Sequence, residues 1–539
     1  MRKHSRLLKS KLKTKRIVVA NNLNSEIVNI DGRFLLDSYS KVVDYILQAS
    51  NEDEINLSNC IIKPNAKLPQ FDIRELYDLV EKMGLSSKIG IEKRTDSKDG
   101  FVITKRLSCY NSVFNSGFLN NIVFEKWVGF DKSQVTELYF NNSVFRNGLS
   151  FSNAKINKYI AFKHCVIDSI FIHKTIFEGS MLDFTQSNIE SVSLISSDFK
   201  YDKETIKEFE ERPDLITSYI NFAYAKLGDF FMSECKTDLS LSFLFAKIAR
   251  KTTISNCTFE EGIFFEDAKL LGPHLVIENK KLPNLSGKLF ISFDRADVQS
   301  DIVINNMTCK FITASSVIIQ KDGRMCIYAS TINNLYFPRA TIYGELSILH
   351  LKNKSKLSLT YAINLGLVNI SLDNLSIFDF DTAKILRQAA QKLNNNIEVT
   401  ALKAIEHKLY LKGNKFNFSF ASIADYTLLY LNQLSSQFGT NWISGVLFCI
   451  FVSMISIGII NLTLGEYYFC LNVEDWAIFT NDFWRKSFEF LWLPNLQNFS
   501  ELTANSKCSA VTVACFIAGK SLIAYGIFQT VSAFRKYSK

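Results

Sequence analysis

The residue types that most often carry enzyme chemistry are few and scattered in this chain. Its 539 residues include six histidines, of which only His164 and His173 lie near each other. The eleven cysteines form no Cys-x-x-Cys pair and no Cys/His set at zinc spacing, which argues against a metal site or a disulfide framework. No P-loop, dinucleotide, nucleophile-elbow, zinc-protease or kinase signature occurs. We therefore predict no catalytic residue, no metal and no cofactor, and we expect the protein not to be an enzyme.

One ionisable residue lies in an unusual place. Lys520 is the only charged residue within residues 510–534, which are otherwise apolar or neutral. A lysine at the centre of a membrane-spanning helix costs roughly 2.5 to 3.5 kcal/mol on insertion scales, so it needs a compensating environment. Two interpretations are open: Lys520 reaches the outer lipid headgroups, or several copies assemble with Lys520 facing a wet lumen that favours anions. Lys520 is the candidate functional residue of the membrane region.

Two apolar segments must position this lysine. Residues 442–464 contain no charge, and as a helix they are long enough to cross the ~30 Å hydrocarbon core. Residues 510–534 form the second expected span, and residues 535–539 are mostly basic. The tryptophan-containing residues 475–493 between them predict a helix in the outer membrane interface. Small residues predict close packing of the two spans as a hairpin; they are Gly445, Cys449, Ser453, Ser456, Gly519 and Gly526.

The composition fits a largely soluble chain with few membrane spans. Hydrophobic residues make up 47% of the chain and charged residues 21%, and Phe alone contributes 45 residues. Part of the net charge of +9 comes from a basic tail, residues 1–20, whose few apolar residues are too short for a signal-sequence core. This tail is either solvated or attracted to anionic lipid or nucleic acid. An odd number of cysteines without a signal sequence indicates a reducing compartment.

An eleven-residue repeat dominates the chain between about residues 107 and 386. The blocks FNNSVF from Phe140, FSNAKI from Phe151 and FKHCVI from Phe162 open and close with large apolar residues five positions apart. A small residue stands two positions before each closing residue, as at Ala154, Cys165, Cys257 and Ala268. A helix cannot keep these spacings on one face, whereas a β-solenoid of short extended segments can. The small positions are expected to point inward.

The inward register makes a prediction about substitutions. Phe at Ala154 or Cys165 is expected to destabilise the solenoid, because the small positions leave no room for a ring. The polar residues between the apolar ones are expected to face water. Lys163, one residue after the opening Phe162, is therefore expected to tolerate change.

This repeat resembles the pentapeptide-repeat family, whose right-handed quadrilateral β-helix stacks a large central residue with a small one two positions earlier. The resemblance covers about half of the chain and implies a mainly β fold of ~22 residues per turn and about ten turns. The steps here alternate between five and six residues, and the central residue is more often Phe than Leu. The sequence from Ala383, AKILRQAAQKLNNNIEVTALKAIEHKLY, resembles the C-terminal half of bacterial membrane-anchored pentapeptide-repeat proteins, which implies topology rather than chemistry.

The expected domains follow from these patterns. Helical periodicity at residues 34–48 and 72–83, with Gly84 as C-cap, predicts an α-helical cap for the open end of the solenoid. Similar periodicity predicts helices at residues 381–392, 397–412 and 421–438. The expected order is a basic tail at 1–20, the cap at 21–104, the solenoid at 105–380 with a helical insertion near 200–217 and a loop near 271–288, linker helices at 381–440, spans at 441–464 and 510–534 around an outer loop at 465–509, and a basic end at 535–539.

Two functions remain open. The first is a membrane-tethered cytosolic solenoid that binds a protein partner as a scaffold. The second is an effector whose solenoid senses a signal and gates an oligomeric pore, as in anti-phage defence, which requires a homo-oligomer because two spans per chain cannot line a pore. The expected partners are the lipid bilayer and an unidentified protein. Nucleic acid is disfavoured, because this basic chain differs from the acidic DNA-mimicking members of the family. The expected location is the inner membrane, with the solenoid and the C-terminus in the cytoplasm.

Overall fold

The structure is a computed structural model that describes residues 28–30, 32–62, 71–95, 100–178, 181–200, 220–279, 289–413, 420–464, 483–492 and 508–535. It is a parallel β-solenoid of about 14 turns with C-terminal helices, and 37% of the residues are in strands. The predicted mainly β solenoid fold is confirmed. The chain divides into two compact units, Met1–Gly272 with Asn279–Leu285, and Pro273–Glu278 with Ser286–Lys539.

The strands of both units are short. Those of the first unit are β1 Val28–Ile30, β2 Arg33–Leu36, β3 Glu54–Asn56, β4 Cys60–Ile62, β5 Phe71–Asp72, β6 Ile91–Lys93, β7 Phe101–Ile103, β8 Arg106–Ser108, β9 Val113–Phe118, β10 Ile122–Phe124, β11 Val128–Gly129, β12 Gln134–Tyr139, β13 Val144–Phe145, β14 Leu149–Ser150, β15 Lys155–Ala161, β16 Val166–His173, β17 Ile176–Glu178, β18 Met181–Asp183, β19 Asn188–Ile195, β20 Asp198–Lys200, β21 Ile220–Asn221, β22 Lys226–Ser233, β23 Lys236–Thr237, β24 Leu241–Ser242, β25 Lys247–Ile248, β26 Thr252–Ser255, β27 Thr258–Phe259, β28 Gly262–Phe264 and β29 Lys269–Leu270. Those of the second unit are β30 His274–Glu278, β31 Phe290–Ser292, β32 Asp297–Val298, β33 Asp301–Asn305, β34 Thr308–Thr313, β35 Ile318–Ile319, β36 Arg324–Tyr328, β37 Thr331–Tyr336, β38 Thr341–Ile342, β39 Glu345–Leu349, β40 Ser355–Ser358, β41 Ile363–Asn364, β42 Leu367–Ile370 and β43 Leu375–Ile377.

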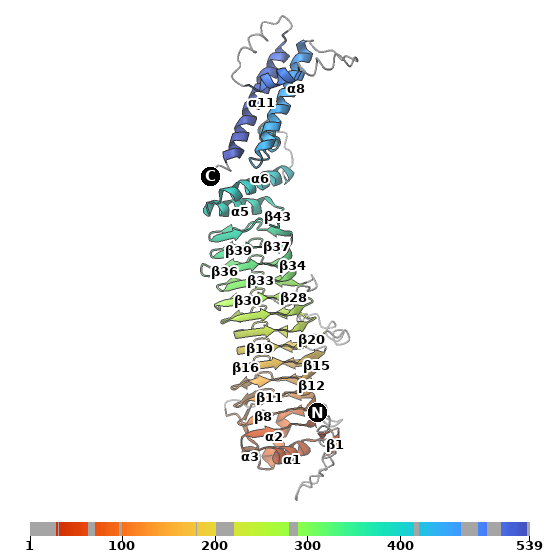
Figure 1. Ribbon diagram of the computed structural model, residues 1–539. Coiled ribbons are helices and arrows are strands. Elements are labelled where there is room, and N and C mark those ends of the chain that lie inside the picture. The colour runs from red at the N-terminus through yellow and green to blue at the C-terminus, as the bar shows by residue number, and fades with distance from the viewer. Residues whose placement is uncertain are drawn as a thin grey trace, which may run out of the picture. The chain divides into compact units, whose positions relative to one another are not determined.

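Parallel pairing sets the length of a turn. Val135 of β12 lies opposite Ile156 of β15, 21 residues further along the chain. Phe145 of β13 lies opposite Ile167 of β16, 22 residues further along. Each strand therefore contacts its equivalents in the turns before and after it, and Figure 1 shows the strands of each unit stacked as successive coils.

Large phenylalanines fill the interior of the first unit. Ring centroids are 5.1 Å apart between Phe140 and Phe162, 5.0 Å between Phe162 and Phe184, and 4.8 Å between Phe184 and Phe222. Each of these rings is less than 2% exposed. The opening residue of each sequence block therefore stacks on its equivalent in the next turn, and burial of these rings is the main apolar contribution to the core.

The corners of the coils use a backbone conformation that the sequence pattern did not indicate. After Phe140, Asn142 has φ 56°, and after Phe151, Asn153 has φ 56°. A left-handed residue lets the chain turn, and the N–H of the small residue that follows bonds back to the opening residue, as Ala154 N does to Phe151 O at 3.4 Å. Asn is among the residues that adopt this conformation most readily, which explains its frequency in the repeat.

The small inward positions also carry hydrogen bonds between turns. Ser143 Oγ donates to Leu119 O at 3.0 Å, and Ile122 N donates to Ser143 Oγ at 3.1 Å. Cys165 Sγ lies 2.8 Å from Phe140 O, and Cys165 N donates to Ser187 Oγ at 2.9 Å. Burial raises the pKa of Cys165 to about 12, so its thiol stays neutral and keeps its proton to donate. Ser, Thr and Cys at these positions therefore link adjacent turns as well as fitting the space.

The N-terminal region contains both helices and solenoid strands. The helices are α1 Tyr39–Ala49, α2 Ile73–Lys82 and α3 Ser86–Ile89. The helix expected at 34–48 starts later, because residues 33–36 form β2, which pairs in parallel with β4. Gly84 has φ 67°, and its N–H bonds to Glu81 O, which ends α2 as expected of a C-cap. Parallel coils thus begin before residue 105, which accounts for more turns than the repeat predicted.

The second interruption of the repeat is not the loop that was expected over residues 271–288. Residues 274–278 form β30, which pairs in parallel with β33 and buries Leu275 and Ile277. The alternation of buried and exposed residues over these five positions is typical of a strand. Residues 280–288 lie outside the described residues, as does nearly all of the helical insertion expected near 200–217, from residue 201 onward.

Helices follow the last strands of the second unit. They are α5 Phe380–Lys392, α6 Asn396–Gly413, α7 Phe420–Ser436, α8 Trp442–Leu464 and α11 Ala510–Arg535. Asp379 caps α5 by accepting from Thr382 N at 2.8 Å. Arg387 Nε donates to Glu406 Oε2 at 2.6 Å, which ties α5 to α6. Because α5 packs on β42, it covers the end of the solenoid core in this unit.

Candidate functional site

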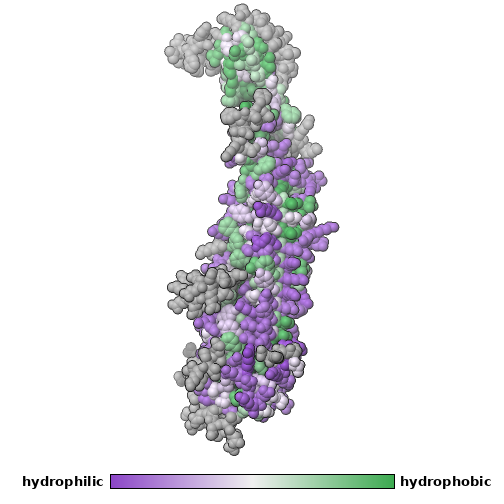
Figure 2. Space-filling view, turned by 180° about the vertical axis from the view of Figure 1, so that it is seen from behind, coloured by the Kyte–Doolittle hydropathy of each residue, from purple (hydrophilic) through white to green (hydrophobic). Residues whose placement is uncertain are grey.

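Two helices of the second unit have the length and apolar character of membrane spans. They are Trp442–Leu464 and Ala510–Phe534. Large apolar side chains on both helices remain exposed, among them Leu447, Phe451, Leu462, Val511 and Phe528. Figure 2 shows hydrophobic surface over this helical region, whereas much of the solenoid surface is hydrophilic. Exposed apolar side chains on long helices suit contact with lipid.

The two helices pack side by side in opposite directions. The Trp442 ring lies 5.8 Å from the Phe534 ring, so the start of α8 meets the end of α11. At the other end, Thr512 Oγ1 donates to Thr463 Oγ1 at 2.9 Å. Between them, Cys449 Sγ lies 3.7 Å from Ile523 O. α8 and α11 therefore form an antiparallel hairpin.

Small residues line the contact between α8 and α11. A Cβ added to Gly526 would meet Cys449 and Phe448, and one added to Gly519 would meet Ser456. A Cβ added to Gly445 would meet Thr530 and the backbone of Ser435 at the end of α7. The structure thus places Gly445, Cys449, Ser456, Gly519 and Gly526 in the tightly packed contact between the two helices.

A short helical segment, residues 483–491, packs against the middle of the hairpin. Ser453, the twelfth of the 23 residues of α8, donates its hydroxyl to Ser487 O at 2.5 Å. Ser453 is thus roughly 16 Å from either end of α8 at 1.5 Å per residue. Phe490 joins Val452, Ile457, Phe516 and Ile523 in one apolar cluster. The structure places residues 483–491 at mid-height of the hairpin, whereas the sequence favoured the outer membrane interface for this helix.

Lys520 contacts the end of this segment. Its Nζ donates to Phe490 O at 2.8 Å and to Trp492 O at 2.9 Å. The same ammonium group lies 4.6 Å from the centroid of the Phe490 ring and 5.8 Å from that of Phe516. Carbonyls at a helix C-terminus carry partial negative charge, and aromatic faces also attract cations. Lys520 is therefore compensated within the chain, by a contact that neither sequence interpretation anticipated.

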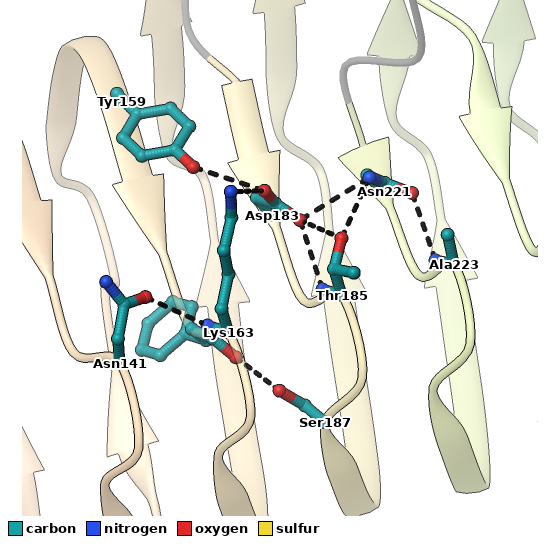
Figure 3. Close-up of polar contacts among 9 residues, drawn as sticks. Asn141, Tyr159, Lys163, Asp183, Thr185, Ser187, Asn221 and Ala223 are labelled. Carbon is teal, nitrogen blue, oxygen red and sulfur yellow. Dashed lines mark hydrogen bonds and ion pairs between the residues drawn. The ribbon is translucent and has the colours of Figure 1, made fainter. Parts of the chain in front are cut away.

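A second polar cluster lies in the solenoid of the first unit, around Asp183 (Figure 3). This carboxylate is only 2% exposed. Lys163 Nζ lies 3.1 Å from its Oδ2, and Tyr159 Oη donates to Oδ2 at 3.1 Å. Thr185 N donates to Oδ1 at 3.0 Å, and Asn221 Nδ2 reaches the same oxygen at 3.4 Å. Burial, together with the charge of Asp183, raises the pKa of Tyr159, so its hydroxyl remains a donor.

The Asp183 cluster joins three successive turns, because Tyr159 lies in β15, Asp183 in β18 and Asn221 in β21, and β18 pairs with both of the other strands. Every acceptor site on the carboxylate faces a donor, and no free side chain is poised for catalysis there. Its role is to hold together the turns that contain β15, β18 and β21. Lys163 is therefore not a freely solvated residue, and its ion pair with Asp183 argues against the expectation that it tolerates change.

We expect Lys163→Ala to lower the free energy of unfolding by about 1 to 3 kcal/mol, because it leaves a buried carboxylate without its cation. Lys158→Ala is the matched control. The Lys158 ammonium lies 3.9 Å from Glu137 on an exposed surface, and such pairs contribute about 1 kcal/mol or less. Thermal melting followed by circular dichroism compares the two variants. Equal melting temperatures would contradict the structural role of Lys163.

Comparison with protein-family models, with curated proteins and with solved structures gives no match. The function is therefore argued from the contacts of the chain itself.

In the other parts of the described chain, no cluster of side chains is arranged as a metal or catalytic site. No group of three or more His, Cys, Asp or Glu side chains that could hold a metal occurs among the described residues. A hollow of about 410 Å³ in the second unit is lined by residues of both charges. Its Arg324 is already paired with Asp301, with Nη2 and Oδ2 3.1 Å apart. Ala154, Cys165, Cys257 and Ala268 are all buried in the solenoid interior.

Sequence reasoning missed Asp183 and Ser487, and it treated Lys163 only as a residue that faces water. For Lys163 and Asp183 a signal did exist, since residues about one turn apart are neighbours in a solenoid and these two differ by 20 positions. For Ser487 the sequence carried no comparable signal. Its contact with Ser453 depends on how a separate segment folds back on the hairpin.

Proposed function

We propose that this protein is a membrane-tethered scaffold. The α8–α11 hairpin anchors it in a bilayer, and the solenoid presents a rigid surface to a protein partner. Support comes from the apolar hairpin surface and from a solenoid with a continuously packed core. The repeat pattern adds the resemblance to bacterial membrane-anchored pentapeptide-repeat proteins. Under this proposal the solenoid and the C-terminus lie in the cytoplasm, and the chain between the spans faces outward.

The observation that favours an anchor over a pore is the environment of Lys520. A lysine that selects anions must present its ammonium to an aqueous lumen. Here the ammonium donates to two backbone carbonyls of the same chain and lies against two rings. The intramembrane charge is used to hold residues 483–491 on the hairpin. The alternative function is an oligomeric pore that acts in anti-phage defence. The experiment must distinguish this pore from the scaffold.

Reconstitution of the full chain into liposomes separates the two functions. For a scaffold, chloride and potassium fluxes measured with entrapped dyes stay at the level of empty liposomes. The chain purified from its native membrane should also carry a protein partner at a fixed ratio, and that ratio should persist at increasing detergent. Ion flux that rises with protein and disappears in Lys520→Leu would overturn the scaffold and support the pore.

A further inference from the structure

Three lysines stack on successive turns of the first unit. Lys226 at the start of β22 lies opposite Lys247 of β25, and Lys247 lies opposite Lys269 of β29. All three are exposed. Neighbouring strands are about 4.8 Å apart, so three like charges follow one another within about 10 Å along the solenoid axis.

None of these lysines has an ion-pair partner within the described part of the chain, although other basic residues of this unit do. Lys155 lies 2.7 Å from Glu178, and Arg250 lies 2.5 Å from Glu190. Arg250 also approaches Asp229, the acidic residue that follows Lys226 by three positions, at 3.9 Å. The turn that contains Lys269 also carries two acidic residues, Glu266 and Asp267, shortly before this lysine in the sequence. Like charges directly opposite each other on adjacent strands are destabilising, so this column lacks a structural benefit.

Two exposed aromatic residues lie beside the lysines. Tyr224 and Phe245 each precede a lysine by two positions and are 53% and 45% exposed. Their rings are stacked, with centroids 4.8 Å apart and planes at 14°. Because one face of each ring is covered by the other ring, ring edges make up part of the exposed aromatic surface. Ring edges carry the positive part of the aromatic quadrupole and suit carboxylate and carbonyl oxygens.

We propose that this surface, the lysine–aromatic ladder, binds an acidic segment of the protein partner; it consists of Tyr224, Lys226, Phe245, Lys247 and Lys269. The inference rests on the proposed scaffold function and names the chemistry of the partner. A short run of Asp or Glu in an extended chain fits three ammonium groups within about 10 Å. Nucleic acid fits less well, because bases stack on open ring faces and the Tyr224–Phe245 stack already covers one face of each ring. Anionic lipid fits less well, because lipid-binding clusters usually hold four to eight basic residues.

Fluorescence anisotropy with the full chain in neutral detergent tests the ladder. The probe is a fluorescein-labelled hexaglutamate peptide. The triple variant Lys226→Glu, Lys247→Glu, Lys269→Glu should bind at least tenfold more weakly than wild type, and wild-type binding should weaken as salt rises. The matched control is Lys126→Glu, Lys174→Glu, Lys236→Glu, which changes three exposed but unstacked lysines of the same unit by the same net charge. The control should stay within about twofold of wild type.

A single substitution distinguishes weaker peptide binding from loss of folding. Lys247→Glu converts three like charges into an alternating column, so it should raise the melting temperature while it weakens peptide binding. Equal losses in the ladder and control triples would mean unspecific attraction and would overturn the proposal. Tighter binding to phosphatidylserine vesicles or to oligothymidine than to the peptide, lost in the ladder triple, would assign the surface to lipid or nucleic acid and overturn it too.

The outcome for the ladder is distinguishable from that for the scaffold. If the native partner co-purifies equally with wild type and with the ladder triple, the ladder is not the docking surface but the scaffold stands. If no partner co-purifies and liposomes conduct ions, the scaffold itself fails, whatever the peptide binds.

Discussion

Replacing Ala154 by Phe should lower the free energy of unfolding by about 3 kcal/mol or more, the upper end of what overpacking a core costs. Ala154 is 2% exposed, and it follows the left-handed corner residue Asn153. A ring at this position would enter the space occupied by the stacked phenylalanines. Cys165→Phe should act similarly, because Cys165 is 1% exposed and its thiol already contacts Phe140 O. Thermal or urea unfolding of the full chain, followed by circular dichroism, measures both.

Ala154→Ser is the matched control for this prediction. Ser143 and Ser187 occupy equivalent inward positions and donate hydrogen bonds to the preceding turn. A serine hydroxyl at residue 154 would find the same kind of acceptor, so the change should stay within about 1 kcal/mol. If Ala154→Phe melts like wild type, the inward register is wrong.

Lys520→Leu should release residues 483–491 from the hairpin. The substitution removes both hydrogen bonds, to Phe490 O and Trp492 O, and leaves these carbonyls without their donor. Hydrogen bonds to a charged group contribute about 1.5 to 3 kcal/mol each, so opening of the segment should become tenfold or more easier. A cysteine at Ser487, with Cys326, Cys449, Cys470, Cys508 and Cys515 replaced by alanine, reports this opening as the rate of maleimide labelling in liposomes.

Lys520→Arg is the control for the predicted release of residues 483–491. Arginine keeps a positive charge and several N–H donors, so it should label at a rate closer to wild type than Lys520→Leu does. If Lys520→Leu leaves labelling of residue 487 unchanged, the contact with Phe490 and Trp492 does not hold the segment. The ammonium would then serve either the lipid headgroups or a lumen, the two interpretations that the sequence offered.

The solenoid fold could be predicted from the sequence because the repeat relates residues that are only a few positions apart. Large residues five positions apart, with a small residue before each closing one, admit few backbone paths, and Phe140, Phe151 and Phe162 all obey the spacing. The corner conformation was harder to infer, because the left-handed position tolerates residues as different as Asn142 and Phe245. The strand at residues 274–278 was missed because its five residues break the spacing of the repeat while keeping the alternation of a strand.

Prediction was limited in a similar way for the α8–α11 hairpin. Small residues predicted which faces of α8 and α11 would meet, because helical periodicity places them in one stripe. The position of residues 483–491 could not be predicted from their composition. A helix with aromatic and charged residues looks alike whether it lies in the membrane interface or packs on other helices. The contact of Ser453 with Ser487 spans 34 residues of sequence and depends on tertiary packing.

The stacking of each coil on its immediate neighbours has a consequence for synthesis of the chain. Most hydrogen bonds between turns join residues 20 to 25 positions apart, as for Ile122 with Ser143 and Cys165 with Phe140. A nascent chain can therefore complete one coil on the previous one as soon as about one more turn has left the ribosome. Residues of the N-terminal coils emerge first and can serve as the template. Most of the solenoid can thus be in place before α8, the first candidate membrane span, emerges.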